Sequence, residues 1–335
     1  MNKKIIKTLF LLLVIFVLQF TFAFTLTDGD VVKGSAETVY LGGFPAGFEV
    51  KSKGATVVKL TDVVTNEGVV SPAKDAGILE GDTLLSVGGV DIFCADDVSK
   101  GLDRNTEGSV VITVLRDGKE TLKEIVPAKD INGKKRLGLM LRDGTSGIGT
   151  MTFIDGSGNF MALGHPICNE NGIIDIGGGE IFRCSIFGVN KGERGRAGEL
   201  KGIFVSDSPI GVVTKNTSRG IVGKMKDDYG FDDLPNIAIG KAEMGKASII
   251  TCVDGVIPKE YDVSIVKTDG NKNDKNLVIK VTDKNLLREA GGIVQGMSGS
   301  PIVQNGKLVG AVTHVFVNDP TRGYGIGIDN MLEVL

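Results

Sequence analysis

Apolar residues along most of this chain fall into short runs that are separated by glycine-rich turns. Val110–Leu115 and Leu122–Val126 flank Asp117-Gly118, and two further apolar runs flank Asn305-Gly306. Asp-Gly and Asn-Gly between apolar runs are strong signals for two-residue β-hairpins. With 48 glycines, 6% aromatic residues and no tryptophan, the pattern predicts a mainly β protein.

The first apolar run is longer and lies at the N-terminus. Thr8–Phe24 follows Lys3, Lys4 and Lys7, and these seventeen residues would span about 26 Å as a helix, just short of a bilayer core. Such a run is typical of a signal peptide or of an uncleaved membrane anchor. We expect residues 1–27 to be an anchor with its basic end in the cytoplasm, which would place the rest of the chain outside the cytoplasm.

The segment after the anchor reads like a PDZ domain. A short helix is expected at Ala73–Ala76, ending at a glycine, and a strand at Thr83–Val87 between two glycine turns. We expect a PDZ domain over residues 40–127. Gly47 and Phe48 would then lie in the loop and strand that capture a peptide carboxylate and pair with an extended peptide.

One loop near the C-terminus has the pattern of a serine nucleophile. Gly296 to Pro301 reads G-M-S-G-S-P, the G-x-S-G-x-P loop of chymotrypsin-like serine peptidases. A serine hydroxyl is a weak nucleophile, so it needs a tight turn that faces a general base. The N–H groups of Ser298 and Gly296 would bind the oxyanion of the tetrahedral intermediate, each donor being worth roughly 3–4 kcal/mol of the barrier. The alternative is an ordinary Gly/Ser hairpin loop.

The chain has only two histidines that can serve as this base. His165 follows the apolar run Phe160–Leu163, so it is expected at the end of a buried strand, where an imidazole can be held in place. His314 lies in the strand expected after Asn305-Gly306, where a single histidine is usually structural. The alternative for His314 is a place in the specificity pocket, beside the residue before the scissile bond.

The third member of a triad is less constrained, because 41 residues are acidic. Asp283 ends the alternating run Leu277–Val281 and lies fifteen residues before Ser298. A carboxylate there can orient the imidazole of His165. It can equally cap the short helix expected at Lys284–Glu289.

These motifs and the residues around them closely resemble the sporulation stage IV protein B serine peptidases of endospore-forming bacteria. The resemblance covers about residues 135–335 and implies a two-barrel, chymotrypsin-like peptidase domain with a triad of His165, Asp283 and Ser298. Pro166 departs from it, because a glycine is expected there. The matching stretches include Ala162–His165, Val281–Asp283, Gly291–Ile302 and Gly310–Pro320.

The same resemblance implies a role in sporulation signalling. The enzyme would act between the forespore and mother-cell membranes and cleave a membrane-bound regulator, and itself, so that an intramembrane protease processes a sigma factor. The PDZ domain would bind a peptide or a C-terminus. Two alternatives are a non-catalytic PDZ adaptor with a degenerate peptidase domain and a general envelope quality-control peptidase.

Charge and cysteine spacing narrow the possible partners. A net charge of −3 gives no reason to expect nucleic acid. Cys94, Cys168, Cys184 and Cys252 show no C-x-x-C spacing, so no metal site is expected, and the chemistry needs no metal or organic cofactor. Outside the cytoplasm Cys168 and Cys184 are the obvious disulfide pair, and free buried thiols are the alternative.

Overall fold

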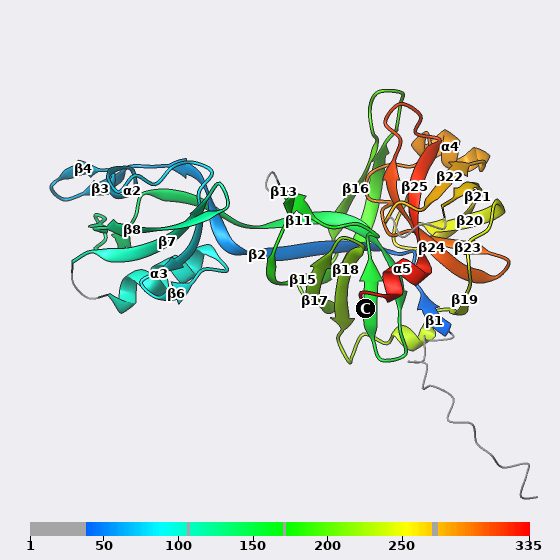
Figure 1. Cartoon of the computed structure of the whole chain (residues 1–335), viewed down its shortest axis with the longest axis horizontal. Coiled ribbons are helices and arrows are strands. Elements are labelled where there is room, and N and C mark those ends of the chain that lie inside the picture. The colour runs from blue at the N-terminus through cyan, green and yellow to red at the C-terminus, as the bar shows by residue number, and fades with distance from the viewer. Residues whose placement is uncertain (1–37, 106–107, 170–171, 270–273) are drawn as a thin grey trace, which may run out of the picture. The chain divides into compact units, whose positions relative to one another are not determined.

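The computed structural model describes residues 38–105, 108–169, 172–269 and 274–335, and these are mostly β structure (Figure 1). The mainly β prediction is therefore confirmed. The anchor predicted at residues 1–27 lies outside the described residues. None of the helices in the described ranges has the length and the apolar composition of a membrane-spanning segment.

Six antiparallel strands close into a first barrel, in which the last strand pairs back with the first (Figure 1). Phe160 and Ile181 lie in its apolar core, together with Met151. Around the barrel the strands are β2 (Pro45–Leu60), β11 (Leu139–Ile154), β12 (Asn159–Ala162), β18 (Gly220–Met225), β17 (Gly211–Thr217) and β15 (Ile176–Asn190).

Six further antiparallel strands close into a second barrel. Its core includes Ile279, Ile302 and Val312. The turn Asn305-Gly306 has φ of +52° and +70°, as the predicted two-residue hairpin requires. Around the barrel the strands are β20 (Gly245–Thr251), β21 (Lys259–Thr268), β22 (Leu277–Val281), β25 (Arg322–Gly327), β24 (Lys307–Val315) and β23 (Pro301–Gln304).

Shorter elements connect and extend the two barrels. In the first, β16 (Glu199–Phe204) forms a long hairpin with β15. In the second, helix α4 (Lys284–Ala290) fills the connection from β22 to β23. The remaining elements are β1 (Thr38–Leu41), β13 (Cys168–Asn169), β14 (Gly172–Ile173), the 3-10 helix η1 (Phe231–Asp233), β19 (Asn236–Ile239) and α5 (Ile328–Leu332).

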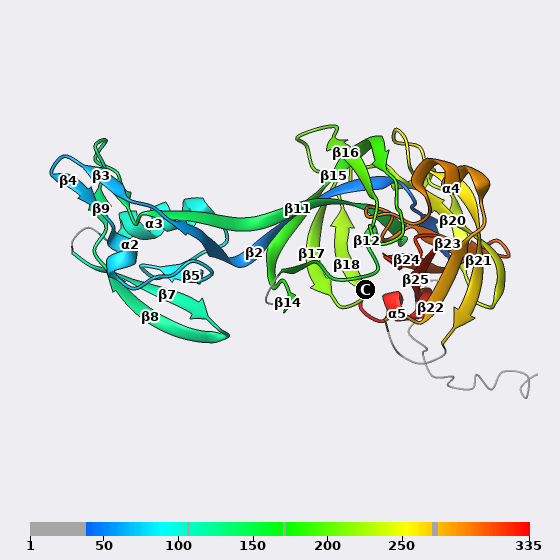
Figure 2. The same cartoon turned by 90° about the horizontal axis from the view of Figure 1, so that it is seen from above.

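A third, smaller apolar core is formed mainly by the residues that connect β2 to β11 (Figure 2). Ile78, Leu84 and Ile112 are fully buried in it. The predicted hairpin turn Asp117-Gly118 joins two of its strands. Its elements are β3 (Val63–Thr65), β4 (Gly68–Val70), α2 (Pro72–Asp75), β5 (Thr83–Val87), β6 (Val90–Asp91), α3 (Ala95–Arg104), β7 (Val110–Arg116), β8 (Lys119–Ile125), β9 (Ala128–Lys129) and β10 (Lys135–Arg136).

The strands β2 and β11 take part in both the small core and the first barrel. Ala55 and Val57 of β2 are buried in the small core, whereas Ala46 and Val50 are buried in the first barrel. The boundary predicted at residue 40 therefore falls inside the barrel. The small core is an insertion between two barrel strands, and β1 with the first half of β2 belongs to the barrel.

The structure places Gly47 and Phe48 in the middle of the barrel sheet. They pair with Ile148 and Gly147 of β11 on one side and with β15 on the other. A strand with two partners has no free edge to which a peptide can add. The side chain of Phe48 is only 2% exposed and packs in the barrel core. These residues therefore do not form the predicted peptide-binding loop.

The close packing of Gly42, between β1 and β2, against β11 predicts that a larger residue there destabilises the fold. A Cβ on Gly42 would lie 2.3 Å from the backbone oxygen of Met151, so Gly42→Ala is expected to lower the free energy of unfolding, measured by urea denaturation, by about 1–3 kcal/mol. Gly188→Ala is the matched control, because its Cβ would meet nothing within 4 Å. Equal stabilities of the two variants would contradict the barrel placement.

Candidate active site

A cavity of about 510 Å³ is lined by residues of both barrels. His165 follows β12 of the first barrel, whereas Ser298 precedes β23 of the second. Both line this cavity, and so does His314 of β24. The structure thus brings the predicted nucleophile, base and specificity residue together. The described residues that line the cavity include no Asp, Glu, Lys or Arg.

Ser298 sits on a tight turn between α4 and β23. The glycines on either side, Gly296 and Gly299, have φ of +95° and +94°, which favours glycine over other residues. A Cβ on Gly299 would also lie 2.0 Å from the backbone oxygen of Thr150. The Ser298 hydroxyl donates to the carbonyl of Thr313 at 2.7 Å. In this conformation its proton is therefore held by Thr313 and not by His165.

His165 is held by its own chain. Leu163 and Gly164 have φ of +68° and +67°, so the chain turns sharply after β12. The Nδ1 atom of His165 lies 2.9 Å from the carbonyl oxygen of Pro166. Because a carbonyl can only accept, Nδ1 carries the proton and Nε2 is left as a proton acceptor.

The charge state of His165 also suits a base. Burial lowers the pKa of the imidazole below its ordinary value of 6.5, and the charge of Lys275 acts in the same direction. The hydrogen bond to Pro166 opposes them and raises the pKa. The net lowering keeps the ring neutral at pH 7, and the neutral ring is the form that can accept a proton.

His314 lies against His165. The centroids of the two rings are 4.7 Å apart. Burial, with the charge of His165 as a second cause, lowers the pKa of His314 to about 4. Its Nδ1 atom is buried without a hydrogen-bond partner among the described residues. His314 therefore contributes a neutral ring to the cavity wall.

The predicted third triad member, Asp283, lies at the start of α4. Its carboxylate accepts hydrogen bonds from the backbone N–H groups of Asn285 and Leu286, at 2.8 and 2.9 Å. In the described part of the chain, no hydrogen bond or ion pair joins Asp283 to His165, and Asp283 does not line the cavity. In this conformation Asp283 is the helix cap.

Hydrogen bonds from the first barrel to the loop that carries Ser298 were not anticipated from the sequence. The hydroxyl of Thr150, on β11, donates to the Gly296 carbonyl at 2.8 Å. The backbone N–H of Leu200, on β16, donates to the Gln295 carbonyl at 2.8 Å. The only sequence signal was a pair of threonines in an apolar strand, since buried hydroxyls require partners.

The cysteines do not form the predicted pair. Cys168 is exposed at the cavity, Cys184 is buried, and both are free thiols, as are Cys94 and Cys252. Burial raises the pKa of Cys184 to about 11, so this thiol is protonated at neutral pH. The alternative of free thiols, and not the disulfide between Cys168 and Cys184, is therefore the one found in the structure.

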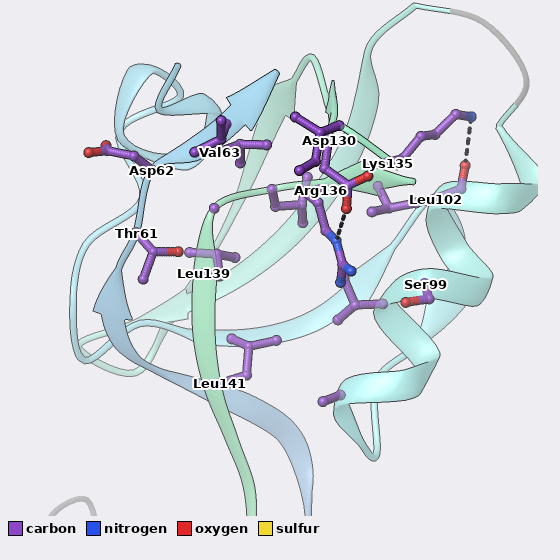
Figure 3. A pocket seen from close by; sticks show the side chains of 16 residues that line it. Thr61, Asp62, Val63, Ser99, Leu102, Asp130, Lys135, Arg136, Leu139 and Leu141 are labelled. Atoms are coloured by element: carbon purple, nitrogen blue, oxygen red, sulfur yellow. Dashed lines mark hydrogen bonds and ion pairs between the residues drawn. The ribbon is translucent and has the colours of Figure 1, made fainter. Parts of the chain in front are cut away.

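A second cavity, of about 460 Å³, lies in the small core (Figure 3). Val98 and Leu102 of α3 line one side, and Leu139 and Leu141 of β11 line another. In the described structure, residues 139–142 pair only with β2, so the other edge of this segment is open. The cavity therefore combines apolar side chains with an unpaired strand edge.

Comparison with known proteins identifies the family. The model of a family described as SpoIVB peptidase S55 matches residues 133–332. The chain belongs to this family. It is accordingly a serine endopeptidase, and the resemblance noted in the sequence is confirmed. A search of curated proteins finds no match.

Two solved structures that resemble this chain are proteases of low sequence identity. The Rv3671c protease of M. tuberculosis, in an inactive form, is 13% identical with a TM-score of 0.34, covering 56% of this chain and 81% of that one. The HtrA-type protease AlgW, solved with a decapeptide, is 15% identical with a TM-score of 0.34, covering 58% of this chain and 53% of that one.

The position of Asp283 gives a prediction that separates its two roles. Asparagine caps a helix about as well as aspartate does, but it cannot stabilise an imidazolium. We expect Asp283→Asn to keep kcat within about fivefold of the parent and Asp283→Ala to lower stability by about 1 kcal/mol. Hydrolysis rates and thermal unfolding measure the two effects. A fall in kcat of about 10⁴ in Asp283→Asn would show that the carboxylate orients His165 instead.

Proposed function

We propose that Ser298 is the nucleophile of this peptidase and His165 its general base. The observation that supports this most is their meeting in one cavity from two different barrels, with Nε2 of His165 free to accept a proton. His165 would take the proton of the Ser298 hydroxyl as it attacks the scissile carbonyl, and would then protonate the leaving amine. The hydroxyl must first leave the Thr313 carbonyl.

The N–H groups of Gly296 and Ser298 would stabilise the oxyanion in this mechanism. Neither donates to an acceptor in the described part of the chain. In the described conformation the Pro166 carbonyl orients the His165 ring by accepting a hydrogen bond from Nδ1. Asp283 would complete a triad only in a conformation in which its carboxylate leaves the cap of α4.

The cavity favours an apolar substrate side chain before the scissile bond. Ile293, Val294 and Val315 line it, and its described lining carries no formal charge when the histidines are neutral. Burying a charged side chain there would be unfavourable, because no opposite charge is present to pair with it. His314 would shape this specificity from its place beside His165.

The biological role that we propose is the one implied by the family. The enzyme would act in sporulation signalling, outside the cytoplasm between the forespore and mother-cell membranes, and would be held there by residues 1–27. Its substrates would be a membrane-bound regulator of an intramembrane protease and its own chain. Family membership supports this role over general quality control and over a non-catalytic adaptor.

We also propose that the small core is a PDZ-like module with its peptide site at the second cavity. An extended peptide can add to the open edge of residues 139–142, beside α3. Gly138 has φ of +78°, which suits a tight loop around a carboxylate. Lys135 and Arg136 line the same cavity, as do Asp62 and Asp130. Lys135 donates to the Leu102 carbonyl at 3.0 Å and Arg136 pairs with Asp130, so a peptide carboxylate would have to replace one of these partners (Figure 3).

Covalent labelling tests the catalytic proposal. A fluorophosphonate probe is expected to label the parent chain and not Ser298→Ala, because the probe bonds to an activated serine. His165→Ala is expected to slow labelling by at least about 10²-fold, since the base is lost. Labelling of Ser298→Ala at the rate of the parent would exclude Ser298 as the nucleophile.

Peptide binding tests the second site. A fluorescein-labelled hexapeptide with an apolar last residue and a free carboxylate is expected to bind more tightly than its amide, as measured by polarisation. Leu141→Gln should weaken binding about tenfold, whereas Met140→Gln should not, since successive residues of a strand face opposite sides. Met140 is 52% exposed and does not line the cavity. Equal affinity for acid and amide would argue against a carboxylate site.

A further inference from the structure

The peptide planes that carry the two proposed oxyanion donors are fixed by hydrogen bonds to their carbonyls, one from outside the loop and one from within it. In a trans peptide the C=O and N–H groups point in opposite directions. The Gln295 carbonyl accepts from Leu200 N–H at 2.8 Å, and the Met297 carbonyl accepts from Ser300 N–H at 3.0 Å. These two planes carry the N–H groups of Gly296 and Ser298 on their other sides. Anchoring the carbonyls therefore decides where the oxyanion donors point.

The plane between these two is held by β11. The Thr150 hydroxyl donates to the Gly296 carbonyl at 2.8 Å, and the Thr150 backbone N–H donates to the Ser298 carbonyl at 2.9 Å. Thr150 is 1% exposed, so water does not compete for these bonds. The N–H group of the same plane, that of Met297, donates to the Val294 carbonyl at 3.1 Å. Glycine tolerates both signs of φ, so the carbonyl end of the plane depends on its bond to Thr150.

The β15–β16 hairpin that supplies Leu200 is itself docked on the second barrel. The Gly198 carbonyl accepts from Gln295 N–H at 2.8 Å. In the turn of the hairpin, the N–H of Gly192 donates to the Ala290 carbonyl at the end of α4, and that of Gly195 donates to Val317, both at 2.9 Å. The hairpin of the first barrel is thus tied to the loop that carries Ser298.

We propose that Leu200 and Thr150 are positioning residues that hold the oxyanion hole in its working orientation. Neither residue touches the reacting atoms. The backbone N–H of Leu200 and the hydroxyl of Thr150 act through the carbonyls of Gln295 and Gly296. The proposal rests on the proposed function, in which Gly296 and Ser298 donate to the oxyanion.

The chain offers a matched control for Thr150. Thr152 lies on the same strand, is fully buried, and donates through its hydroxyl to the Gly299 carbonyl at 2.8 Å. The peptide plane of that carbonyl carries the Ser300 N–H, which holds the Met297 carbonyl, so Thr152 is linked to the Ser298 donor only through one further hydrogen bond. Thr150→Val and Thr152→Val each remove one buried hydrogen bond to the same loop. Only the first releases a plane that shares a Cα atom with the planes of both oxyanion donors.

Leu200 allows a similar pair of variants. Leu200→Ala keeps the backbone N–H and removes the apolar side chain, which is 3% exposed. Leu200→Pro also removes the N–H that holds Gln295. Near-ultraviolet circular dichroism and thermal unfolding of the full chain establish which variants are folded. If Leu200→Pro does not fold, the comparison of Thr150→Val with Thr152→Val alone tests the proposal.

The readouts are kcat and KM for p-nitrophenyl butyrate and the second-order rate constant of fluorophosphonate labelling. Thr150→Val and Leu200→Pro are expected to lower kcat and the labelling rate by about 10²- to 10³-fold, the usual effect of losing one oxyanion donor, with KM within about twofold. Thr152→Val is expected to stay within about fivefold of the parent, and Leu200→Ala is expected to lose at least tenfold less activity than Leu200→Pro. Equal rates within each pair would overturn the proposal.

Failure of the proposed function gives a different result. If Ser298→Ala were labelled like the parent, Ser298 would not be the nucleophile, whatever the Thr150 and Leu200 variants show. If Ser298→Ala is inert and the two pairs show no difference, only the positioning role is wrong.

Discussion

The pairing of β2 with β11 is the constraint on which the catalytic half of the molecule depends. The ladder runs from Leu60 and Leu139 at the small core to Pro45 and Thr150 beside the candidate active site. Its register shifts between Arg142 and Gly144, where the strands pass from one core to the other. Register decides which side chains face inward, so it sets the burial of Thr150 as well as that of Leu141.

Because Thr150 is fixed by that ladder, the first barrel determines the conformation of a loop that belongs to the second. The carbonyls of residues 295–299 each accept a hydrogen bond, and β11 and β16 of the first barrel supply four of those five donors. Asp283 is connected to the candidate active site in a similarly indirect way. By capping α4 it stabilises the helix whose last residue, Ala290, holds the β15–β16 hairpin. A substitution of Asp283 can therefore reach the active site without any contact with His165.

The sequence predicted the parts of the site that carry their own local signal. Glycines around Ser298 mark a turn with positive φ, the short supply of histidines singles out His165, and Asn305-Gly306 marks a hairpin. The prediction that Gly47 and Phe48 form a peptide-binding loop was wrong, because a PDZ loop and a buried barrel strand share the same pattern of glycine and apolar residues. Contacts such as Leu200 N–H to Gln295 left no trace, since any residue except proline can donate a backbone hydrogen bond.

The insertion of the small core between β2 and β11 follows from the same strand geometry. Two paired antiparallel strands can extend beyond a barrel and enter another core without breaking their hydrogen bonds, provided that a bulge adjusts their twist. The register shift at Arg142/Gly144 supplies this adjustment. Residues 38–50, far from Ser298 in sequence, are then required to close the barrel that carries His165 and holds the loop of Ser298. A fragment of residues 133–332, although it spans the family match, would lack β1 and β2 and leave that barrel open.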